Sequence, residues 1–246
     1  MRAQTEPDDK LGEGIMSPTL FSYCIPYDDG AAPNPFWGLC TLAICKPIIR
    51  RVANIGDWIV GTGSVNSPIR DISGKVVYAL RVTQKKTMGE YDRFTQSEFP
   101  DKIPQMESAD RRRRCGDSIY NFSTRIPSLR SSVHNEKNRR TDLGGEYVLL
   151  SDHFFYFGDQ PVALPEELRA IAQQQQGHRS RLNVPYVHAF VRWIESLKYP
   201  CAVPIGNPQW WSLPNVQASC AACATGQRQE DEADLAETGA PCSKPC

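Results

Sequence analysis

The sequence predicts an α+β protein, because β-rich runs fill its middle and an amphipathic helix stands near its C-terminal end. Two β-rich runs, "GDWIVGTGS" at 56–64 and "GKVVYALRVTQK" at 74–85, lie close together, and a third, "EYVLLSDHFFYFG", occupies 146–158. Further along, apolar residues recur at the spacing of one helix face: Val187, Phe190, Val191, Ile194 and Leu197. Hydrophobic residues make up 40% of the 246-residue chain, which is enough for a core of ordinary size.

The first predicted element is a strand that follows a disordered leader. Residues 1–18 mix acidic residues, glycine and proline without apolar periodicity, so we expect no fixed structure there. "TLFSYCIPY" at 19–27 is rich in aromatic and branched residues and predicts a strand, ended by the turn residues at 28–30. The stretch "YDDGAAPNPFWGLCTLAICKP", residues 27–47, then forms a loop that leaves this strand.

The two central β-rich runs predict an antiparallel hairpin. Residues 65–74 connect them and contain the Pro and Gly expected of a medium-length loop. Gly61 and Gly63 lie inside the first run. They indicate a β-bulge or a bend, or a place where another group approaches the backbone closely.

A helix and then a long irregular segment follow the hairpin. "TMGEYDRFTQSEF" at 87–99 predicts a short helix, with Thr87 as N-cap and Glu90 as its capping-box partner. Between 99 and 145 the only predicted element is a short strand in "GDSIYNF", 116–122. Loops of this length inside one domain are often functional.

The last predicted elements are two short strands and two helices. The run at 146–158 is expected to break into two strands at Ser151 and Asp152. "VALPEELRAIAQQQQ" at 162–176 predicts a helix opened by a proline, and "VPYVHAFVRWIESL" at 184–197 predicts a second one.

These elements predict one domain, residues 19–211, followed by a cysteine-containing acidic tail at 212–246. Lys and Arg together number 28, as do Asp and Glu, so net charge points to no anionic partner. The sequence has no run of 18 apolar residues and a polar N-terminus. It therefore predicts no membrane span, no membrane partner and no secretion, and we expect a cytoplasmic location.

Several segments together carry a family resemblance. "YCIPYDDGAAPNPFWGLCTLAICKPIIRR", "GDWIVGTGS", "VVYALRVTQKKTMGEY", "CGDSIY" and "VLLSDHFFYFG" with "QGHR" follow one another between about Phe21 and Lys198. With these segments in this order, the chain resembles the bacterial and phage nucleotide modification associated domain, type 2. The resemblance implies a role in making or handling modified bases in DNA. It also implies a nucleotide or DNA base, DNA and other DNA-modification enzymes as partners, in the cytoplasm of a bacterium or a phage-infected host.

The hairpin carries a second resemblance, at the level of the fold. From about Ile55 to Thr83 it looks like the corresponding element of PUA-like and EVE-like barrels, which hold a flipped or modified base in a pocket. This resemblance implies a PUA-like or related small β-barrel with two to three flanking helices.

Three separate segments offer the chemistry of a nucleotide pocket. We expect the loop at 27–47, the strand end at 61–64 and a region with two tyrosines to meet around a nucleobase, a modified base or a nucleotide. The predicted substrate-binding residues are Tyr27, Asp28, Asn34, Trp37, Lys46, Arg50, Gly61, Gly63, Ser64, Tyr120 and Tyr156.

Residue type gives the main candidates their roles. Asn34 and Asp57 would bond to the base edge, because amides and carboxylates match its donors and acceptors. Trp37 and a tyrosine would stack on the base, and Lys46 with Arg50 would hold phosphate. The alternative is that the polar loop residues only shape turns and that the aromatic rings fill the core.

An enzyme, either a transferase or a hydrolase acting on a nucleotide or DNA base, is the alternative class. The candidates for its acid or base are Asp57, Asp117, His153 and Lys46, and no motif assigns the catalytic role. Cys115 stands beside four arginines as a possible nucleophile, with a buried thiol as the plainer interpretation. A third alternative is a scaffold whose tail recruits partner enzymes.

The nine cysteines are an odd number for a disulfide framework. Five are interpreted as reduced thiols: Cys24, Cys40, Cys45, Cys115 and Cys201. The tail cysteines Cys220, Cys223, Cys242 and Cys246 have spacing similar to that of a four-thiolate zinc site, and an unstructured tail is the alternative. The four histidines have no metal-site spacing, and no cofactor other than this zinc is predicted.

Overall fold

The main sheet has six strands, and its strand order puts β1 (Leu20–Ile25) and β3 (Trp58–Gly63) in the interior. The computed structural model describes residues 17–175 and 177–213. The strands of this sheet are β1 (Leu20–Ile25), β3 (Trp58–Gly63), β4 (Lys75–Arg81), β9 (His153–Tyr156), β10 (Val162–Ala163) and β11 (His178–Arg179). Their order is β10-β4-β3-β1-β11, with β9 also paired to β4. β1 and β3 run parallel, and the other pairs are antiparallel.

Two smaller sheets and several short helices complete the described part of the chain. The second sheet is formed by β2 (Cys40–Leu42), β8 (Tyr147–Ser151) and β5 (Gln84–Thr87), and β6 (Tyr120–Asn121) pairs with β7 (Ser128–Leu129). The α-helices are α1 (Pro47–Val52), α2 (Met88–Ser97), α3 (Arg111–Arg114), α4 (Arg139–Gly144) and α5 (Val187–Ser196). The 3-10 helices are Pro100–Lys102, Glu136–Asn138, Glu166–Ile171, Arg181–Tyr186 and Gln209–Ser212.

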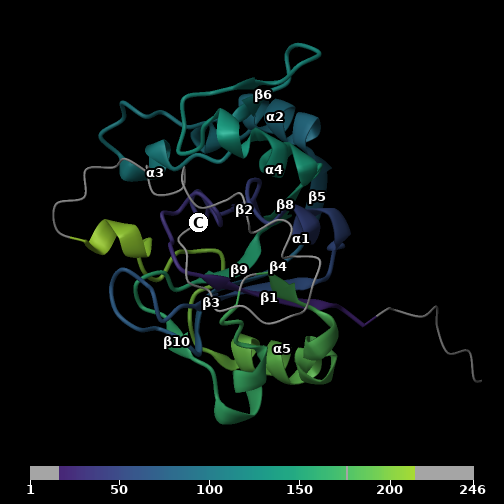
Figure 1. The fold of residues 1–246 in the computed structure, drawn as a ribbon, viewed down its shortest axis with the longest axis vertical. Helices are drawn as coiled ribbons and strands as arrows, with labels where there is room; N and C mark the ends of the chain where they lie inside the picture. Colours follow the sequence, from purple (N-terminus) through teal and green to yellow (C-terminus); the bar gives the residue numbers. More distant parts are fainter. Residues whose placement is uncertain (1–16, 176, 214–246) are drawn as a thin grey trace, which may run out of the picture.

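Strand β1 is buried on both faces, because its side chains point alternately into two layers of the hydrophobic core. Leu20 packs in the layer that contains Trp58 and Phe190, whose ring centroids lie 6.1 Å apart. Helix α5 supplies Phe190 and covers this face of the sheet in Figure 1. Tyr23 and Ile25 point into the opposite layer, which also contains residues of β2 and β8. The second sheet thus packs on the face that α5 does not cover.

Several predicted elements are confirmed. The strand β1, the hairpin β3–β4, the two successive strands β8 and β9, and the helix α5 lie where the sequence placed them. Thr87 caps α2: its hydroxyl accepts from the Glu90 amide at 3.3 Å, and the Glu90 carboxylate accepts from the Thr87 amide at 2.8 Å. The register of the hairpin shifts between Gly61 and Thr62, which confirms the bulge.

The small barrel implied by the hairpin resemblance is not confirmed. The strands of the described residues form three sheets, and the main sheet stays open. Its edge strands β10 and β11 have two residues each and pair only inward, with β4 and β1. The resemblance covered one hairpin, and closure depends on the edge strands that lie outside it.

The helix predicted at 162–176 is wrong in type and extent. Strand β10 takes its first two residues, and a 3-10 helix spans Glu166–Ile171. Leu168 and Ile171, both buried, stand three residues apart, and this spacing puts them on one face of a 3-10 helix. Helices α1 and α4 and strands β2 and β5 were not predicted, because each is too short to show a period.

The predicted leader falls outside the described residues except for 17 and 18, and the predicted tail does so except for 212 and 213. The domain bounds 19–211 therefore stay a prediction. Across 17–175 and 177–213, no helix combines the length and the apolar composition that crossing a bilayer requires.

Candidate functional site

A strained turn between β2 and α1 presents Cys45. Cys45 and Lys46 both have positive φ angles, 57° and 39°, which side chains with a Cβ rarely adopt. Pro47 then opens α1 at its first position. Strained turns of this kind persist only where surrounding contacts hold them, and they cluster at functional sites.

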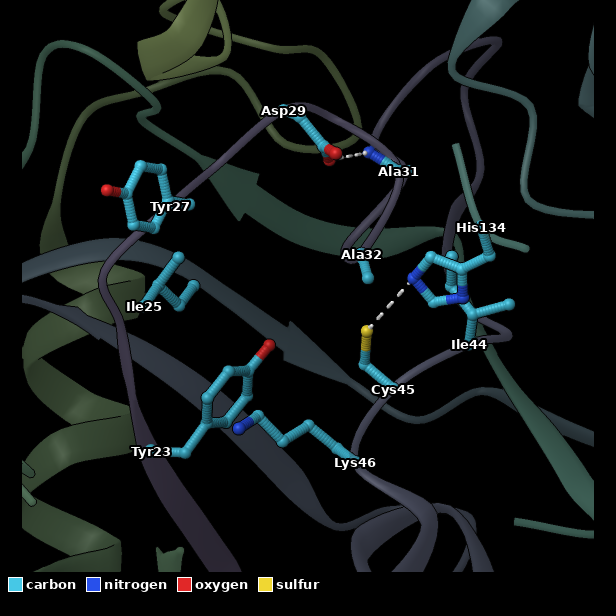
Figure 2. Close-up of a pocket in the computed structure, with 10 residues that line it drawn as sticks. All are labelled: Tyr23, Ile25, Tyr27, Asp29, Ala31, Ala32, Ile44, Cys45, Lys46 and His134. Atoms are coloured by element: carbon cyan, nitrogen blue, oxygen red, sulfur yellow. Dashed lines mark hydrogen bonds between the residues drawn. The ribbon is translucent and has the colours of Figure 1, made fainter. Parts of the chain in front are cut away.

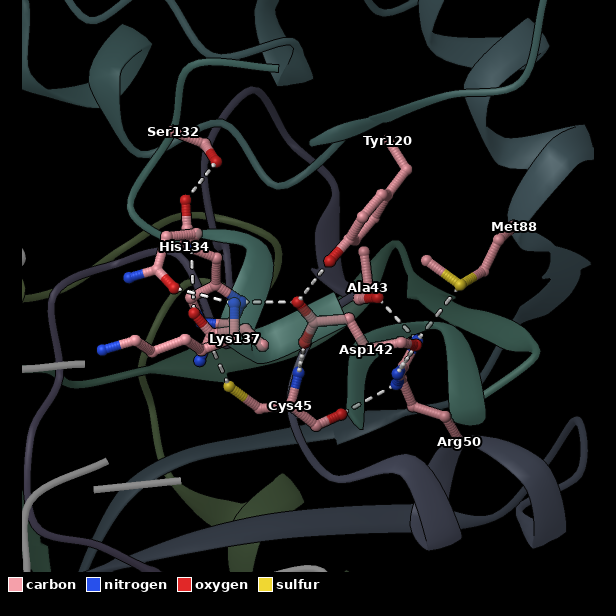
Figure 3. A network of polar contacts seen from close by, with 11 residues as sticks. Ala43, Cys45, Arg50, Met88, Tyr120, Ser132, His134, Lys137 and Asp142 are labelled. Carbon is pink, nitrogen blue, oxygen red and sulfur yellow. Dashed lines mark hydrogen bonds and ion pairs between the residues drawn. The ribbon is translucent and has the colours of Figure 1, made fainter. Parts of the chain in front are cut away.

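Cys45 faces a histidine that is in turn held by an aspartate (Figure 3). The sulfur of Cys45 lies 3.8 Å from Nε2 of His134. On the other side of the ring, Nδ1 of His134 lies 2.7 Å from Oδ2 of Asp142. His134 and Asp142 are buried, whereas Cys45 is partly exposed. A carboxylate accepts hydrogen bonds, so Nδ1 donates to Asp142, and in a neutral ring this leaves Nε2 as an acceptor that faces the thiol.

Asp142 connects the turn, the histidine and a tyrosine. Its Oδ1 accepts from the backbone amide of Cys45 at 3.1 Å, and its Oδ2 also accepts from the Tyr120 hydroxyl at 3.1 Å. Burial raises the pKa of Tyr120, and the neighbouring Asp142 raises it further, so the phenol stays a donor. Tyr120, predicted as a binding residue, therefore belongs to this network.

Arg50 fixes the backbone around the cluster and is fully buried. Its guanidinium donates to the carbonyls of Cys45 at 2.8 Å, Ala43 at 2.6 Å and Tyr147 at 3.0 Å, and also to the carbonyl of Asp142 (Figure 3). The sequence predicted Arg50 as a phosphate ligand. In the structure it instead joins the Cys45 turn to α4 and β8.

A pocket opens beside Cys45 (Figure 2). The space inside it that admits the centre of a water-sized sphere is about 20 Å³, roughly that of one water molecule. Ten residues line it: Tyr23, Ile25, Tyr27, Asp29, Ala31, Ala32, Ile44, Cys45, Lys46 and His134. The ammonium of Lys46 lies 4.9 Å from the centre of the Tyr23 ring. Aromatic, cationic and acidic groups thus share one hollow with the thiol and the imidazole. We call it the Cys45 pocket.

Of the predicted binding residues, Tyr27 and Lys46 line the Cys45 pocket. Asp28, which stands between the lining residues Tyr27 and Asp29 in the sequence, forms a buried pair with Tyr156, whose hydroxyl donates to Oδ2 of Asp28 at 2.7 Å. Burial raises the pKa of Asp28 to about 7, although the hydrogen bond from Tyr156 opposes this shift. Burial also raises the pKa of Tyr156.

The Asp28→Asn variant should show a weaker dependence of stability on pH. The folded chain keeps the Asp28 proton up to about pH 7, whereas an unfolded aspartate loses it near pH 3.8. Between these values the folded state binds more protons, so stability falls as pH rises, by about 4 kcal/mol over the window. Urea midpoints at several pH values should show a flatter slope for Asp28→Asn. Asp71→Asn is the control, because Asp71 is exposed and a backbone hydrogen bond from Ser73 lowers its pKa. An unchanged slope in Asp28→Asn would contradict this assignment.

Asn34 and Asp117 belong to a buried network away from the pocket. The ammonium of Lys102 donates to Oδ1 of Asn34 at 2.6 Å, to its carbonyl at 2.9 Å and to that of Leu39 at 2.6 Å. Asp117 accepts from the hydroxyls of Thr41 and Tyr91, both at 2.6 Å. Neither Asn34 nor Asp117 lines the Cys45 pocket.

Trp37 also lies outside the Cys45 pocket. The Arg112 guanidinium lies over its ring, 4.8 Å from the centroid, and this cation–π contact is at another part of the described surface. The structure therefore brings Lys46, but not Asn34 or Trp37, to the Cys45 pocket.

Gly61, Gly63 and Ser64 are explained by packing. A Cβ on Gly61 would collide with the side chains of Ile25 and Tyr78, and one on Gly63 would collide with Ile72. The Ser64 hydroxyl accepts from the amide of Asn66 at 3.0 Å, within the turn that follows β3. These positions accommodate close neighbours inside the fold, and none of the three lines the Cys45 pocket.

Asp57 and His153 lie near a second, more open hollow. Asp57 lines it and accepts from the amides of Thr19 at 2.7 Å and Asn54 at 2.8 Å. His153 pairs through Nε2 with Glu195, which lines the same hollow, at 2.6 Å. Ser17 and Thr19 also line this hollow, but no cysteine of the described residues does.

The predicted zinc ligands Cys220, Cys223, Cys242 and Cys246 lie outside the described residues. Cys45, His134 and Asp142 bring three metal-ligating atoms within 4.8 Å of one another. However, Asp142 is bonded to Nδ1 and Cys45 faces Nε2, so the thiol and the carboxylate lie on opposite edges of one imidazole. This arrangement suits proton transfer from the Cys45 thiol to the His134 imidazole better than coordination of one ion by all three side chains.

Sequence reasoning did not single out Cys45, His134 or Asp142 as a site. The available signal was Cys45 standing two residues before a helix-opening proline. Cys115, the thiol that the sequence did weigh as a nucleophile, is buried and donates to the carbonyl of Asp29 at 3.0 Å. Burial raises its pKa, which agrees with the interpretation as a buried thiol.

The fold and the site define a mixed α/β protein with an open main sheet and a cysteine–histidine–aspartate row at a pocket. The chain belongs to the nucleotide modification associated domain 2 family, whose model matches residues 17–214, and this confirms the family expected from the sequence. Membership connects the protein with nucleotide modification. No curated protein and no solved structure matches the chain significantly.

Proposed function

We propose that the protein serves nucleotide modification by binding a nucleobase, modified or not, or a nucleotide in the Cys45 pocket. The observation that carries this proposal is the convergence of Tyr27, Asp29 and Lys46 on one hollow in a chain of this family.

Each of these side chains offers a contact that a nucleotide can use. An aromatic ring such as that of Tyr27 can stack on a base of any sequence. The carboxylate of Asp29 can accept from an exocyclic amino group, as acids do when they contact cytosine. The ammonium of Lys46 can bind a phosphate as a point charge.

Titration of the full-length protein with nucleoside monophosphates, by calorimetry, tests this proposal. We expect Tyr27→Ala to weaken binding by about 1–3 kcal/mol, because one base–aromatic contact is lost. Lys46→Met should weaken the binding of nucleotides more than that of the corresponding nucleosides, because nucleosides lack the phosphate. Trp37→Ala is the matched control, since Trp37 is an aromatic residue of the same loop that lies outside the pocket. Binding lost in Trp37→Ala but retained in Tyr27→Ala and Lys46→Met would refute the Cys45 pocket as the site.

Two further predictions from the sequence stay proposals. DNA and other DNA-modification enzymes are proposed as partners on the basis of the family alone. Pull-down with the full chain, compared with a chain that ends at residue 211, tests whether the tail recruits those enzymes.

The enzymatic alternative is favoured by a specific observation, the row Cys45–His134–Asp142.

A further inference from the structure

We propose that Cys45 is the nucleophile of an acyl-transfer reaction, with His134 as its base and Asp142 holding the histidine. The substrate class is a carboxylic amide or ester, and the inference that a nucleotide carries it rests on the function proposed above.

The geometry has the order that nucleophilic catalysis requires. A base must reach the nucleophile, and a third group must orient the base. The Cys45 sulfur lies 3.8 Å from Nε2 of His134, a separation within the range of a thiol–imidazole contact in an unliganded site. Asp142 lies 2.7 Å from Nδ1, on the opposite edge of the same ring. The thiol and the carboxylate therefore contact different nitrogens of the imidazole. His134 can accept the thiol proton at one nitrogen while Asp142 holds the other.

Access distinguishes Cys45 from the buried cysteines of the domain, and the neighbouring His134 distinguishes it from the exposed Cys201. Cys24, Cys40 and Cys115 are buried. Cys45 is partly exposed and lines the pocket together with His134 (Figure 2). It also stands on a left-handed turn between a strand and a helix, a construction that presents the nucleophile of other hydrolases at the tip of a sharp bend.

The turn is held from several sides, as a positioned nucleophile requires. The Cys45 amide donates to Asp142, and the Cys45 carbonyl accepts from Arg50 at 2.8 Å. The carboxylate that orients the histidine thus also anchors the backbone of the nucleophile. A change at Asp142 would disturb both members at once.

The reaction proceeds in two balanced halves. His134 takes the proton from Cys45, and the sulfur attacks the carbonyl carbon of the substrate, while the π electrons of the carbonyl move to its oxygen. When the carbonyl re-forms, the bond to the amine or alcohol breaks, and this leaving group takes the proton from His134. Water then gives a proton to His134 and attacks the thioester, and the thiolate leaves and is reprotonated.

Selective alkylation of the full-length protein tests the reactivity of the thiol. With limiting iodoacetamide and peptide mapping, Cys45 should react about tenfold faster than Cys201, which is exposed. The faster alkylation of Cys45 relative to Cys201 should disappear in His134→Gln. Cys201→Ser should leave the alkylation rate at Cys45 unchanged. Equal rates for the two cysteines in the unaltered protein would overturn the proposal. So would bound zinc that disappears in Cys45→Ser and blocks alkylation until a chelator is added, because this result would identify a metal site.

Acylation by an activated ester tests the covalent step. With p-nitrophenyl acetate we expect a burst of nitrophenol of about one equivalent and an acetyl thioester on the Cys45 peptide, both absent in Cys45→Ser. Acetylation confined to other cysteines would overturn the inference. Calorimetry of the unaltered protein with nucleoside monophosphates separates the two proposals, because it measures binding independently of acylation. Acylation without nucleotide binding would refute the proposed binding function and leave the thiol chemistry standing.

Discussion

Replacing Arg50 with methionine should destabilise the domain by about 4 kcal/mol. The guanidinium is fully buried and donates to the carbonyls of Ala43, Cys45, Asp142 and Tyr147. Methionine fills part of the volume but offers no N–H group. The carbonyls therefore stay buried without their donors, at a cost of about 1–3 kcal/mol for each one that finds no other partner.

Arg51→Met is the control for this prediction. Arg51 is the next residue in α1, yet it is exposed, and its bond to the Gly144 carbonyl, at 2.7 Å, is at the surface. Its loss should cost less than about 1 kcal/mol. Urea unfolding of both variants provides the measurement, and equal destabilisation would show that burial of Arg50 does not have the effect assigned to it. Arg50→Met should also lower the alkylation rate of Cys45 in the folded protein, because the Cys45 carbonyl loses its anchor.

Replacing Lys102 with methionine should destabilise the domain by about 3–5 kcal/mol. The ammonium is fully buried and donates to Asn34, Leu39 and, at 3.2 Å, the hydroxyl of Thr41. Burial lowers the pKa of Lys102 to about 8, so the side chain is still mainly charged at neutral pH. Its charge also favours the ionised form of Asp117, whose pKa burial raises. Removing the lysine leaves this carboxyl without its cation.

The double variant Lys102→Met, Asp117→Asn separates the two causes of this loss. If the uncompensated carboxylate dominates, the double variant should recover part of the stability that the single variant loses. If the oxygens that lost their donor dominate, no recovery is expected. Thermal and urea unfolding of both variants provide the measurement, with Lys86→Met as the control because Lys86 is partly exposed and its ammonium lies over the Phe94 ring. A Lys102→Met variant as stable as this control would contradict the prediction.

Local chemistry explains which parts of the fold could be predicted. Thr87 and Glu90 form a capping box within four residues of chain, so the sequence alone predicts the start of α2. Strands β8 and β9 separate at Asp152 for a similarly local reason. The sheet order was not predicted, because the parallel pairing of β1 with β3 joins segments that are far apart in the sequence.

The candidate site was predicted only in part for the same reason. Tyr27 and Lys46 lie in the loop that the sequence selected, and both line the Cys45 pocket. His134 stands 89 residues from Cys45, in a segment without periodicity, so spacing could not connect the two. Asn34 has the donors and acceptors of a base-reading amide, yet Lys102, 68 residues away, occupies its oxygen in the fold. Residue type shows what a side chain can bond to, and tertiary structure decides which partner it finds.

The separation of Cys45 from His134 has a consequence during synthesis of the protein. Both partners of the thiol, His134 and Asp142, come from a part of the chain that the ribosome makes long after Cys45. Until that part has emerged and docked, Cys45 is a cysteine of unexceptional reactivity. Any enhanced nucleophilicity would therefore arise only when the chain has folded, and the rate of alkylation at Cys45 would serve as a measure of correctly folded protein.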